Sequence, residues 1–149
     1  MSDRKAMPDL PPPPEPQGAY LPAVAHNGLV YTAGMTPREG GVLIAVGRVG
    51  AEVDLETARQ AAGLSALRAL SAAAATVGLQ RIDRLLRVGV FVACTDEFTQ
   101  HSVVADGASE ALEHVLGDSG RAVRTALGVR ALPGGACVEV ELIATYTSS

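Results

Sequence analysis

The segment 86–129, LRVGVFVACTDEFTQHSVVADGASEALEHVLGDSGRAVRTALGV, contains a strand pattern, a helix pattern and a second strand pattern in that order. Residues 86–93 alternate as in a strand with one buried face. A helix is predicted over about 96–116, and a strand over 124–129. A helix that joins two strands of one sheet indicates a parallel pairing. The apolar residues on one face of that helix are Phe98, Ala105, Ala108, Leu112 and Val115.

The residues before this segment predict three short strands and a long helix. The turn pair at 27–28, Asn-Gly, predicts a hairpin whose second strand covers 29–33, and the pair Gly-Gly at 40–41 leads into a third strand over 42–46. Asp54 is a good N-cap for an Ala- and Leu-rich helix over 54–78. Leu64 and Leu67 need a covering surface of their own. The helix side that we expect against a sheet consists of Ala58, Ala62, Ala66, Ala69 and Ala73.

The final strand is predicted over 137–146, after a turn around 133–135. Its alternation places two glutamates, Glu139 and Glu141, on the face opposite to the apolar one. The complete order β-β-β-α-β-α-β-β predicts an α+β fold, a mixed sheet with two helices on one face. The other face stays uncovered in a monomer and carries Phe91 and Ile143, which predicts an oligomer.

Length and composition restrict the functional classes. The chain has 149 residues, a net charge of −4 and 3% aromatics. The sequence has no basic run or aromatic platform that would favour nucleic-acid binding. It also has no run of about 18 apolar residues that would favour a membrane span. We expect a Pro-rich flexible arm over 1–17, one domain over 18–149 and, without a secretory leader, a cytoplasmic protein. The arm is interpreted as a passive tail, with a proline ligand for another domain as the alternative.

Metal and thiol chemistry receive little support from the sequence. Cys94 and Cys137 lie in apolar runs and are interpreted as small core residues rather than reactive thiols. The three histidines are far apart and lack metal-ligand spacing, so no metal is expected. Serines and cysteines lack an obvious histidine partner in sequence, although partners in space stay open.

The carboxy-terminal third contains the candidate chemistry. Arg124 opens a strand, and Glu139 and Glu141 share one face of the next. A guanidinium can hold a carboxylate through two parallel hydrogen bonds, and a nearby glutamate can activate water. We expect the Arg124 guanidinium to be unpaired within its own chain. The alternative is a purely structural ion pair between Arg124 and one of the glutamates.

Four motifs in the correct order resemble the RidA/YjgF family of 2-iminobutanoate/2-iminopropanoate deaminases over about 18–146. Residues 18–20, GAY, resemble the family's G-P-Y, and 29–37, LVYTAGMTP, resemble its strand that ends in S-G-Q-x-P. Residues 90–98, VFVACTDEF, resemble V-F-V followed by D-F. Arg124, the pair at 132–133, LP, and 138–141, VEVE, resemble the closing R-S/T, L-P and I/V-E-I/V-E.

The resemblance implies a chorismate-mutase-like fold, a homotrimer, and active sites in clefts between subunits that hydrolyse reactive imines without a cofactor. It implies that Arg124 binds the substrate carboxylate and that Glu139 handles the attacking water. Tyr20, Ala33 and Gly34 would line the cleft. Family polar groups are replaced at Ala33, Met35 and Ala126, and at Ser102 or a neighbour.

Three functional hypotheses follow. The first is deamination of small 2-imino or enamino acids to 2-oxo acids and ammonia. The second is a non-catalytic homotrimer that binds a small carboxylate or a protein partner, which the replaced polar groups favour. The third, an activity on RNA or translation that has been attached to the family, is disfavoured by the acidic net charge.

Overall fold

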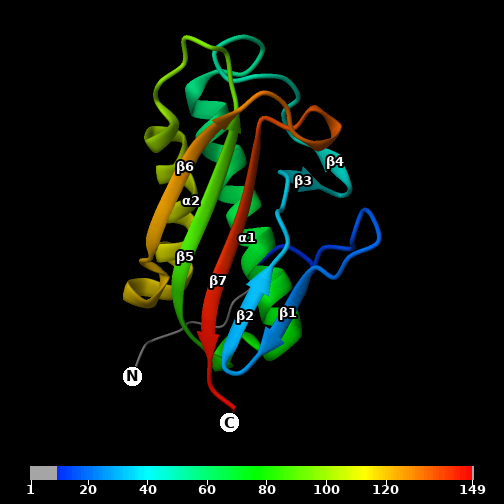
Figure 1. Ribbon diagram of the computed structural model, residues 1–149, viewed down its shortest axis with the longest axis vertical. Helices are drawn as coiled ribbons and strands as arrows, with labels where there is room; N and C mark the ends of the chain where they lie inside the picture. Colours follow the sequence, from blue (N-terminus) through cyan, green and yellow to red (C-terminus); the bar gives the residue numbers. More distant parts are fainter. Residues whose placement is uncertain (1–9, 149) are drawn as a thin grey trace.

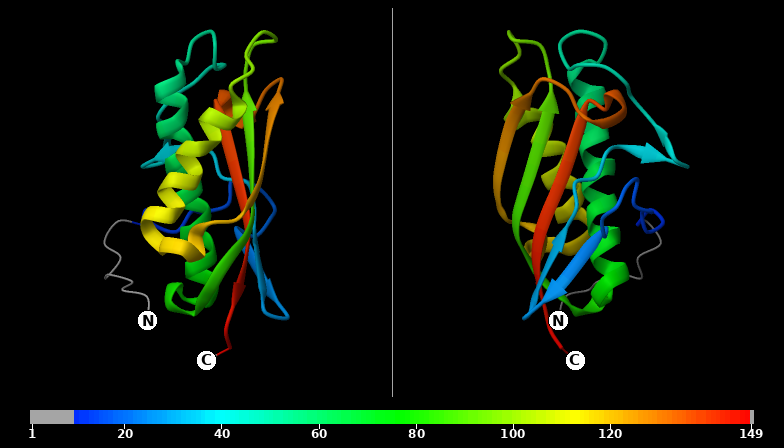
Figure 2. Two further views of the ribbon diagram at one scale, coloured as in Figure 1. Left: turned by 90° about the vertical axis from the view of Figure 1, so that its left-hand side faces the viewer. Right: turned by 45° about the vertical axis from the view of Figure 1, so that its right-hand side comes forward.

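The computed structural model describes residues 10–148 and forms two layers, a five-stranded sheet and a pair of helices (Figure 1). The sheet order is β1-β2-β7-β5-β6, in which only the β5–β6 pair is parallel. Both helices cover the same face, as the edge-on view in Figure 2 shows. The predicted α+β architecture with a mixed sheet is confirmed. The strands of this sheet are β1 Ala23–His26, β2 Leu29–Thr32, β5 Ile82–Ala93, β6 Val123–Val129 and β7 Val138–Tyr146.

Helix α1, Leu55–Val77, follows the sequence prediction closely. Asp54 caps it by accepting a hydrogen bond from the Thr57 amide at 2.8 Å, and Gly78 ends it with a φ of 92°. The alanine side is fully buried and allows the helix to lie close to the sheet and to α2, His101–Leu116. Short 3-10 turns follow each helix and precede β7: Leu79–Arg81, Gly117–Gly120 and Pro133–Gly135.

The strand predicted over 42–46 is largely wrong. The structure instead forms a separate two-stranded hairpin from β3, Arg38–Glu39, and β4, Val42–Leu43. Beyond β4 the chain keeps only isolated contacts with its neighbours, such as the bridge between Val46 and Ala136. An apolar, β-branched run without a sheet edge to join therefore stays an exposed arm.

Two predicted boundaries differ from the structure. Strand β5 begins at Ile82 instead of 86, because two register shifts interrupt its alternation at the start. Helix α2 begins at His101 instead of about 96, because the Phe98 amide donates to the Thr95 carbonyl at 3.2 Å and forms a turn. The loop 94–100 therefore crosses the end of the sheet before the helix starts.

The proline-rich segment packs against the domain over its described part. Ser71 on α1 donates a hydrogen bond to the Pro11 carbonyl at 2.7 Å, and Leu10 packs against the core. Prolines 11–14 line a groove of about 540 Å³ together with Leu64 and Leu67. The segment therefore lies beside the two leucines and covers them in part, since both stay partly exposed in the groove. Residues 1–9 of the predicted arm lie outside the described residues, and the domain boundary at 17/18 stays a prediction.

Candidate functional site

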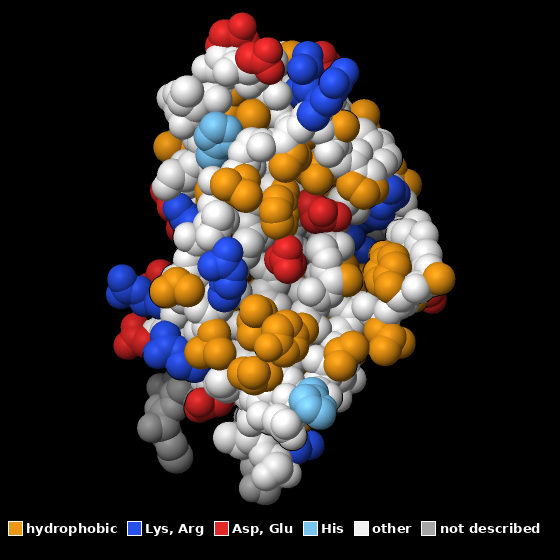
Figure 3. Space-filling model, in the orientation of Figure 1, with side chains coloured by type: hydrophobic (Ala, Val, Ile, Leu, Met, Phe, Trp, Pro, Cys, Tyr) orange, Lys and Arg blue, Asp and Glu red, His pale blue; other side chains and the backbone are white. Residues whose placement is uncertain are grey.

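Glu139 lies in the middle of the sheet face that the helices leave uncovered. Its neighbours on β7, Val138 and Val140, are buried on the helix side, so Glu139 projects to the opposite side. It pairs in register with Phe91 on β5. Figure 3 shows this face, where hydrophobic side chains surround a pair of acidic ones. Its exposed apolar residues include Val24, Tyr31 and Leu127.

The environment of Glu139 disfavours its charged form. Burial raises the pKa of the Glu139 carboxyl, and the neighbouring negative charge of Glu141 raises it further. No hydrogen bond or ion pair within residues 10–148 engages this carboxylate. A half-buried carboxyl group with a raised pKa is a stronger proton acceptor than an ordinary carboxylate and is suited to acid–base chemistry.

Gly34 makes room for Glu139. A Cβ atom at position 34 would lie 2.7 Å from the Glu139 Cδ atom, which is closer than side chains tolerate. The preceding residue, Ala33, is partly buried against the core, and its amide donates to the Pro22 carbonyl at 2.8 Å. Tyr20 precedes this pairing by two residues, is 47% exposed, and accepts a hydrogen bond from the Gln17 amide at its hydroxyl.

Arg124 lies on the other face of the sheet, against α2. In the parallel register it stands beside Val88, whose side chain is buried under the helices. Its Nη1 atom donates to Asp106 Oδ1 at 2.9 Å and to Ser109 Oγ at 3.0 Å. Its Nη2 atom donates to Ser102 Oγ at 2.8 Å. The expectation of an unpaired guanidinium is therefore wrong in the single chain.

A single chain does not bring Arg124 and Glu139 together, because the sheet separates them. The alternative of a structural ion pair between Arg124 and a glutamate is also wrong, since the partner is Asp106. The signal in the sequence was the spacing of residues 102, 106 and 109, which puts three polar side chains on one face of α2. The Arg124 and Asp106 side chains are 20% and 49% exposed, so solvent weakens their attraction.

The replaced family positions have different surroundings. Met35 is 5% exposed and exchanges backbone hydrogen bonds with Val140, so its side chain belongs to the core. Ala126 follows Arg124 by two residues on the helix side and packs against the core. Ser102, however, contacts Arg124 directly. The polarity near Arg124 comes from α2 rather than from its own strand.

A cavity of about 660 Å³, which the sequence patterns do not predict, opens at the carboxyl ends of β5 and β6. Cys94 lies in its wall with Sγ 3.4 Å from the Nε2 atom of His101. The core interpretation is confirmed for Cys137, which is buried, whereas Cys94 is partly buried: it packs against the core and also lines the cavity. The sequence signal for this pair is the loop between β5 and α2. This loop brings His101, seven positions after Cys94, back to the end of β5.

The described residues contain neither a cluster of metal ligands nor a helix that could span a membrane. Within residues 10–148 no group of three His, Cys, Asp or Glu side chains could hold a metal ion. Neither helix described there combines the length and apolarity needed to cross a bilayer.

The fold is that of a chorismate-mutase-like α+β protein of the RidA/YjgF type. The chain belongs to the family described as Endoribonuclease L-PSP, whose model matches residues 12–146. It is 35% identical to Protein TCP17 of Trypanosoma cruzi over 138 residues, covering 90% of this chain and 85% of that protein.

Solved structures agree with this assignment. The crystal structure of Atu1372 from Agrobacterium tumefaciens, a protein of unknown function, is 36% identical with a TM-score of 0.84, covering 87% of this chain and 82% of that one. The YjgF gene product of E. coli is 20% identical with a TM-score of 0.67, covering 89% and 92%. The latter similarity supports the fold alone.

Proposed function

We propose that this protein hydrolyses small 2-imino or enamino acids to 2-oxo acids and ammonia, in clefts between the subunits of a homotrimer. The observation that supports this most directly is Glu139. Its carboxyl group is half-buried, has a raised pKa and lies beside Gly34 on an uncovered sheet face. A second subunit on this face would enclose the carboxyl group and exclude bulk water.

The proposed chemistry requires one base and one anion-binding group. Glu139 removes a proton from water as the water oxygen attacks the imine carbon, and this proton passes to the imine nitrogen. The hydroxyl proton of the tetrahedral adduct then moves to the amine, the carbon–nitrogen bond breaks, and ammonia leaves the 2-oxo acid. A carboxylate with a raised pKa is a stronger base than an ordinary one, which favours this step. Arg124 binds the substrate carboxylate, and Tyr20, Ala33 and Gly34 form the wall near Glu139.

Arg124 and Glu139 would act in one site only if they come from different subunits. Within a chain they lie on opposite sides of the sheet, whereas β6 is an edge strand and can approach a neighbouring copy. Asp106 and the two serines then hold the guanidinium in position until a substrate carboxylate competes for it. The proposal needs no cofactor, and the two free thiols fit a cytoplasmic setting.

A non-catalytic trimer that binds a small carboxylate or a protein partner is the second candidate. The apolar residues at positions 33, 35 and 126 favour it. The occupied guanidinium of Arg124 favours the protein-binding form of this candidate, because a paired guanidinium is less free to hold a small carboxylate. Cleavage of RNA, which the family name suggests, fits poorly with 16 acidic and 12 basic side chains.

The direct test generates 2-iminobutanoate with an amino-acid oxidase and follows its decay. We expect Arg124→Ala to lower kcat/KM by at least about tenfold, because the carboxylate loses its charged partner. Glu139→Gln should lower kcat more than it raises KM. Arg121→Ala removes an exposed arginine elsewhere and should leave the rate unchanged. Equal decay with wild type and both site variants, at the background rate, would exclude the enzyme in favour of the binding protein.

Mixing variants tests the shared cleft. Arg124→Ala and Glu139→Gln subunits, refolded together in equal amounts, should recover about a quarter of the wild-type activity, because one in four neighbouring pairs in a closed ring combines an intact arginine with an intact glutamate. A site contained within one chain would recover none.

A further inference from the structure

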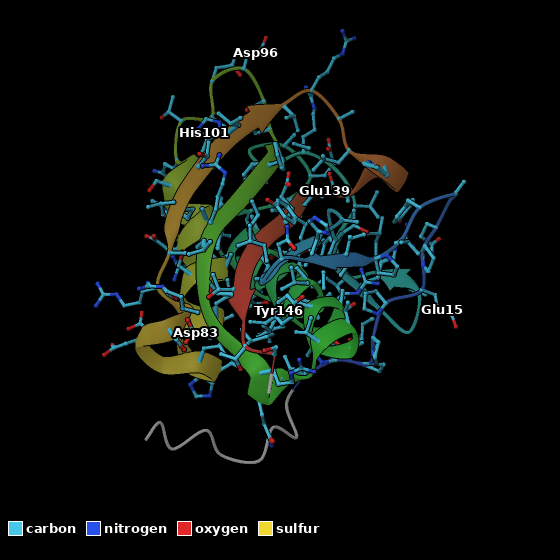
Figure 4. The ribbon with its side chains drawn as sticks, turned by 60° about the horizontal axis from the view of Figure 1, so that its bottom comes forward. Glu15, Asp83, Asp96, His101, Glu139 and Tyr146 are labelled. Carbon is cyan, nitrogen blue, oxygen red and sulfur yellow. The ribbon has the colours of Figure 1, made fainter. Side chains whose placement is uncertain are left out.

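The cavity at the carboxyl ends of β5 and β6 contains chemistry that the deamination proposal does not use. Because these two strands are parallel, the loops that follow them meet at one edge of the sheet, where α2 also begins. Figure 4 shows Asp96 and His101 at this end of the molecule, apart from Glu139 on β7. The side chains that matter are Arg48, Cys94, Asp96, Phe98, His101 and Arg130.

Cys94 and His101 form a thiol–imidazole pair in the cavity wall. The distance between Sγ and Nε2 is 3.4 Å, and both residues are partly exposed. Burial is the main cause that raises the pKa of the Cys94 thiol; the positive charge of Arg48 opposes it and Asp96 adds to it. A thiol held in its neutral form needs a base at the moment of attack, and Nε2 is positioned to be that base.

The fold keeps this pair in place. A Cβ atom at Gly128 would lie 2.6 Å from His101 Nε2 and 3.1 Å from Cys94 Sγ, so a larger residue on β6 would displace both. The Phe98 ring meets the His101 ring edge-on, with centroids 5.4 Å apart and planes at 81°. His101 is also the first residue of α2, which fixes its backbone.

Two arginines give the cavity a preference for anions. Within the described residues, neither the Arg48 nor the Arg130 guanidinium forms a hydrogen bond or an ion pair, although the Glu52 carboxylate, which accepts from the Arg48 amide at 2.9 Å, attracts the charge of Arg48 from outside the lining. Asp96 is the one acidic residue in the lining, so the cavity has two permanent positive charges against one negative charge. The chain as a whole has a net charge of −4, so attraction of an anion to this place would be local.

We propose that Cys94, with His101 as its base, is a nucleophilic site for small carboxylates that carry a soft electrophilic carbon, such as α,β-unsaturated acids. Arg48 and Arg130 bind the carboxylate. The sulfur forms a bond to the β carbon, the electrons of the double bond move to the α carbon, and the thiol proton passes through His101 to that carbon. No atom leaves, so the product is a thioether adduct.

Iodoacetate and iodoacetamide test this site on the full-length protein, because they differ in charge and share one mechanism. In each reaction the sulfur–carbon bond forms, iodide leaves with the bonding electrons, and the proton goes to His101. We expect Cys94 to react faster than N-acetylcysteine at neutral pH, as measured by intact mass and peptide mapping. The ratio of the iodoacetate rate to the iodoacetamide rate should exceed that of N-acetylcysteine by about fivefold or more.

Variants separate the contributions. Arg48→Ala and Arg130→Ala should lower this ratio, whereas Arg121→Ala, with the same change in charge, should not. His101→Gln should slow both reagents and move the rate–pH profile to higher pH, with folding checked by circular dichroism. Cys137 is the internal control for a buried thiol. The proposal is overturned if Cys94 reacts no faster than N-acetylcysteine, if the charge preference matches that of the free thiol, or if the wild-type profile follows an unassisted thiol.

Discussion

At the level of single residues, the guanidinium of Arg124 can bind either side chains of its own chain or an external ligand. Asp106 and two serines of α2 hold it within the chain, yet an exposed fraction of 20% leaves it accessible to a ligand. A surface ion pair of this kind contributes little to stability, because water screens it and two side chains lose mobility. The pair therefore costs a ligand little to displace.

We predict that Asp106→Asn strengthens carboxylate binding. The guanidinium loses its competing anion but keeps neutral hydrogen-bond partners, so affinity for 2-oxobutanoate should rise several-fold, as measured by calorimetry. The free energy of unfolding should fall by less than about 1 kcal/mol. Glu110→Gln is the matched control, since it breaks a different ion pair of α2, between Glu110 and Arg59 of α1, at 2.7 Å. Weaker binding by Asp106→Asn would show that the pair is needed to orient Arg124.

Glu139 leads to a prediction about pH. Its pKa is raised in the folded chain, so as pH increases the unfolded chain releases this proton first. The contribution of Glu139 to stability is therefore favourable below the ordinary carboxyl pKa and is lost as pH rises through the raised value. Glu139→Gln should become progressively more stable than wild type over that range, in urea unfolding at fixed protein concentration. Glu113→Gln, on an exposed position of α2, is the control for the loss of a carboxylate that water surrounds.

At the level of elements, α1 and α2 approach closely where small residues meet. A Cβ atom at Gly107 would lie 2.1 Å from the Arg59 carbonyl oxygen, whereas one at Gly63 would lie 3.3 Å from the Gly107 carbonyl oxygen. We predict that Gly107→Ala destabilises the protein by about 1–3 kcal/mol or more, because two backbones must separate. Gly63→Ala, in the same interface, should be near neutral, because the gain in helix propensity of up to about 1 kcal/mol offsets a small shift. Chemical unfolding of both variants measures the two changes in the free energy of unfolding. Equal losses would contradict the close backbone contact at Gly107.

The proline segment and α1 give a second matched pair. Ser71 and Ser65 are both buried on α1, but only Ser71 has a partner in the described residues, the Pro11 carbonyl. Ser71→Ala should cost about 1 kcal/mol, because it leaves that carbonyl without its donor. Ser65→Ala should be neutral or stabilising, since an unpaired buried hydroxyl is removed. If Ser71→Ala were also neutral in thermal unfolding, the segment would not be docked in solution.

The elements that could be predicted from sequence are those with a regular period. Helix α1 was predicted almost to its ends, because Asp54 and Gly78 mark them and alanines repeat between them. The start of β5 was missed, because its register shifts interrupt the alternation that defines a strand. The alternation of β7 also predicts the correct sheet face for Glu139. The partners of Arg124 and Cys94 could not be predicted in this way, because they depend on how α2 packs against the sheet, and local sequence patterns do not encode that packing.

At the level of the whole molecule, the uncovered sheet face connects fold with function. The face is half apolar, and Val24 and Tyr31 are 46% and 47% exposed on neighbouring positions of β1 and β2. Water contact with such a surface is unfavourable, and a second copy of the chain would remove it. The same contact would enclose Glu139, so assembly and activity are expected to depend on one surface.

We therefore predict that Tyr31→Glu reduces the sedimentation mass of the protein and its imine hydrolysis together. A charge in the centre of a buried contact between subunits is costly, whereas a charge on an exposed surface is not. Val42→Glu is the control, because Val42 is 68% exposed on the separate β3–β4 hairpin, and it should change neither property. The apolar face would not be the contact between subunits if the wild-type protein sedimented as a monomer or if the Tyr31→Glu variant stayed assembled. A monomer that still hydrolyses imines would leave Arg124 and Glu139, on opposite sides of one sheet, without a shared site.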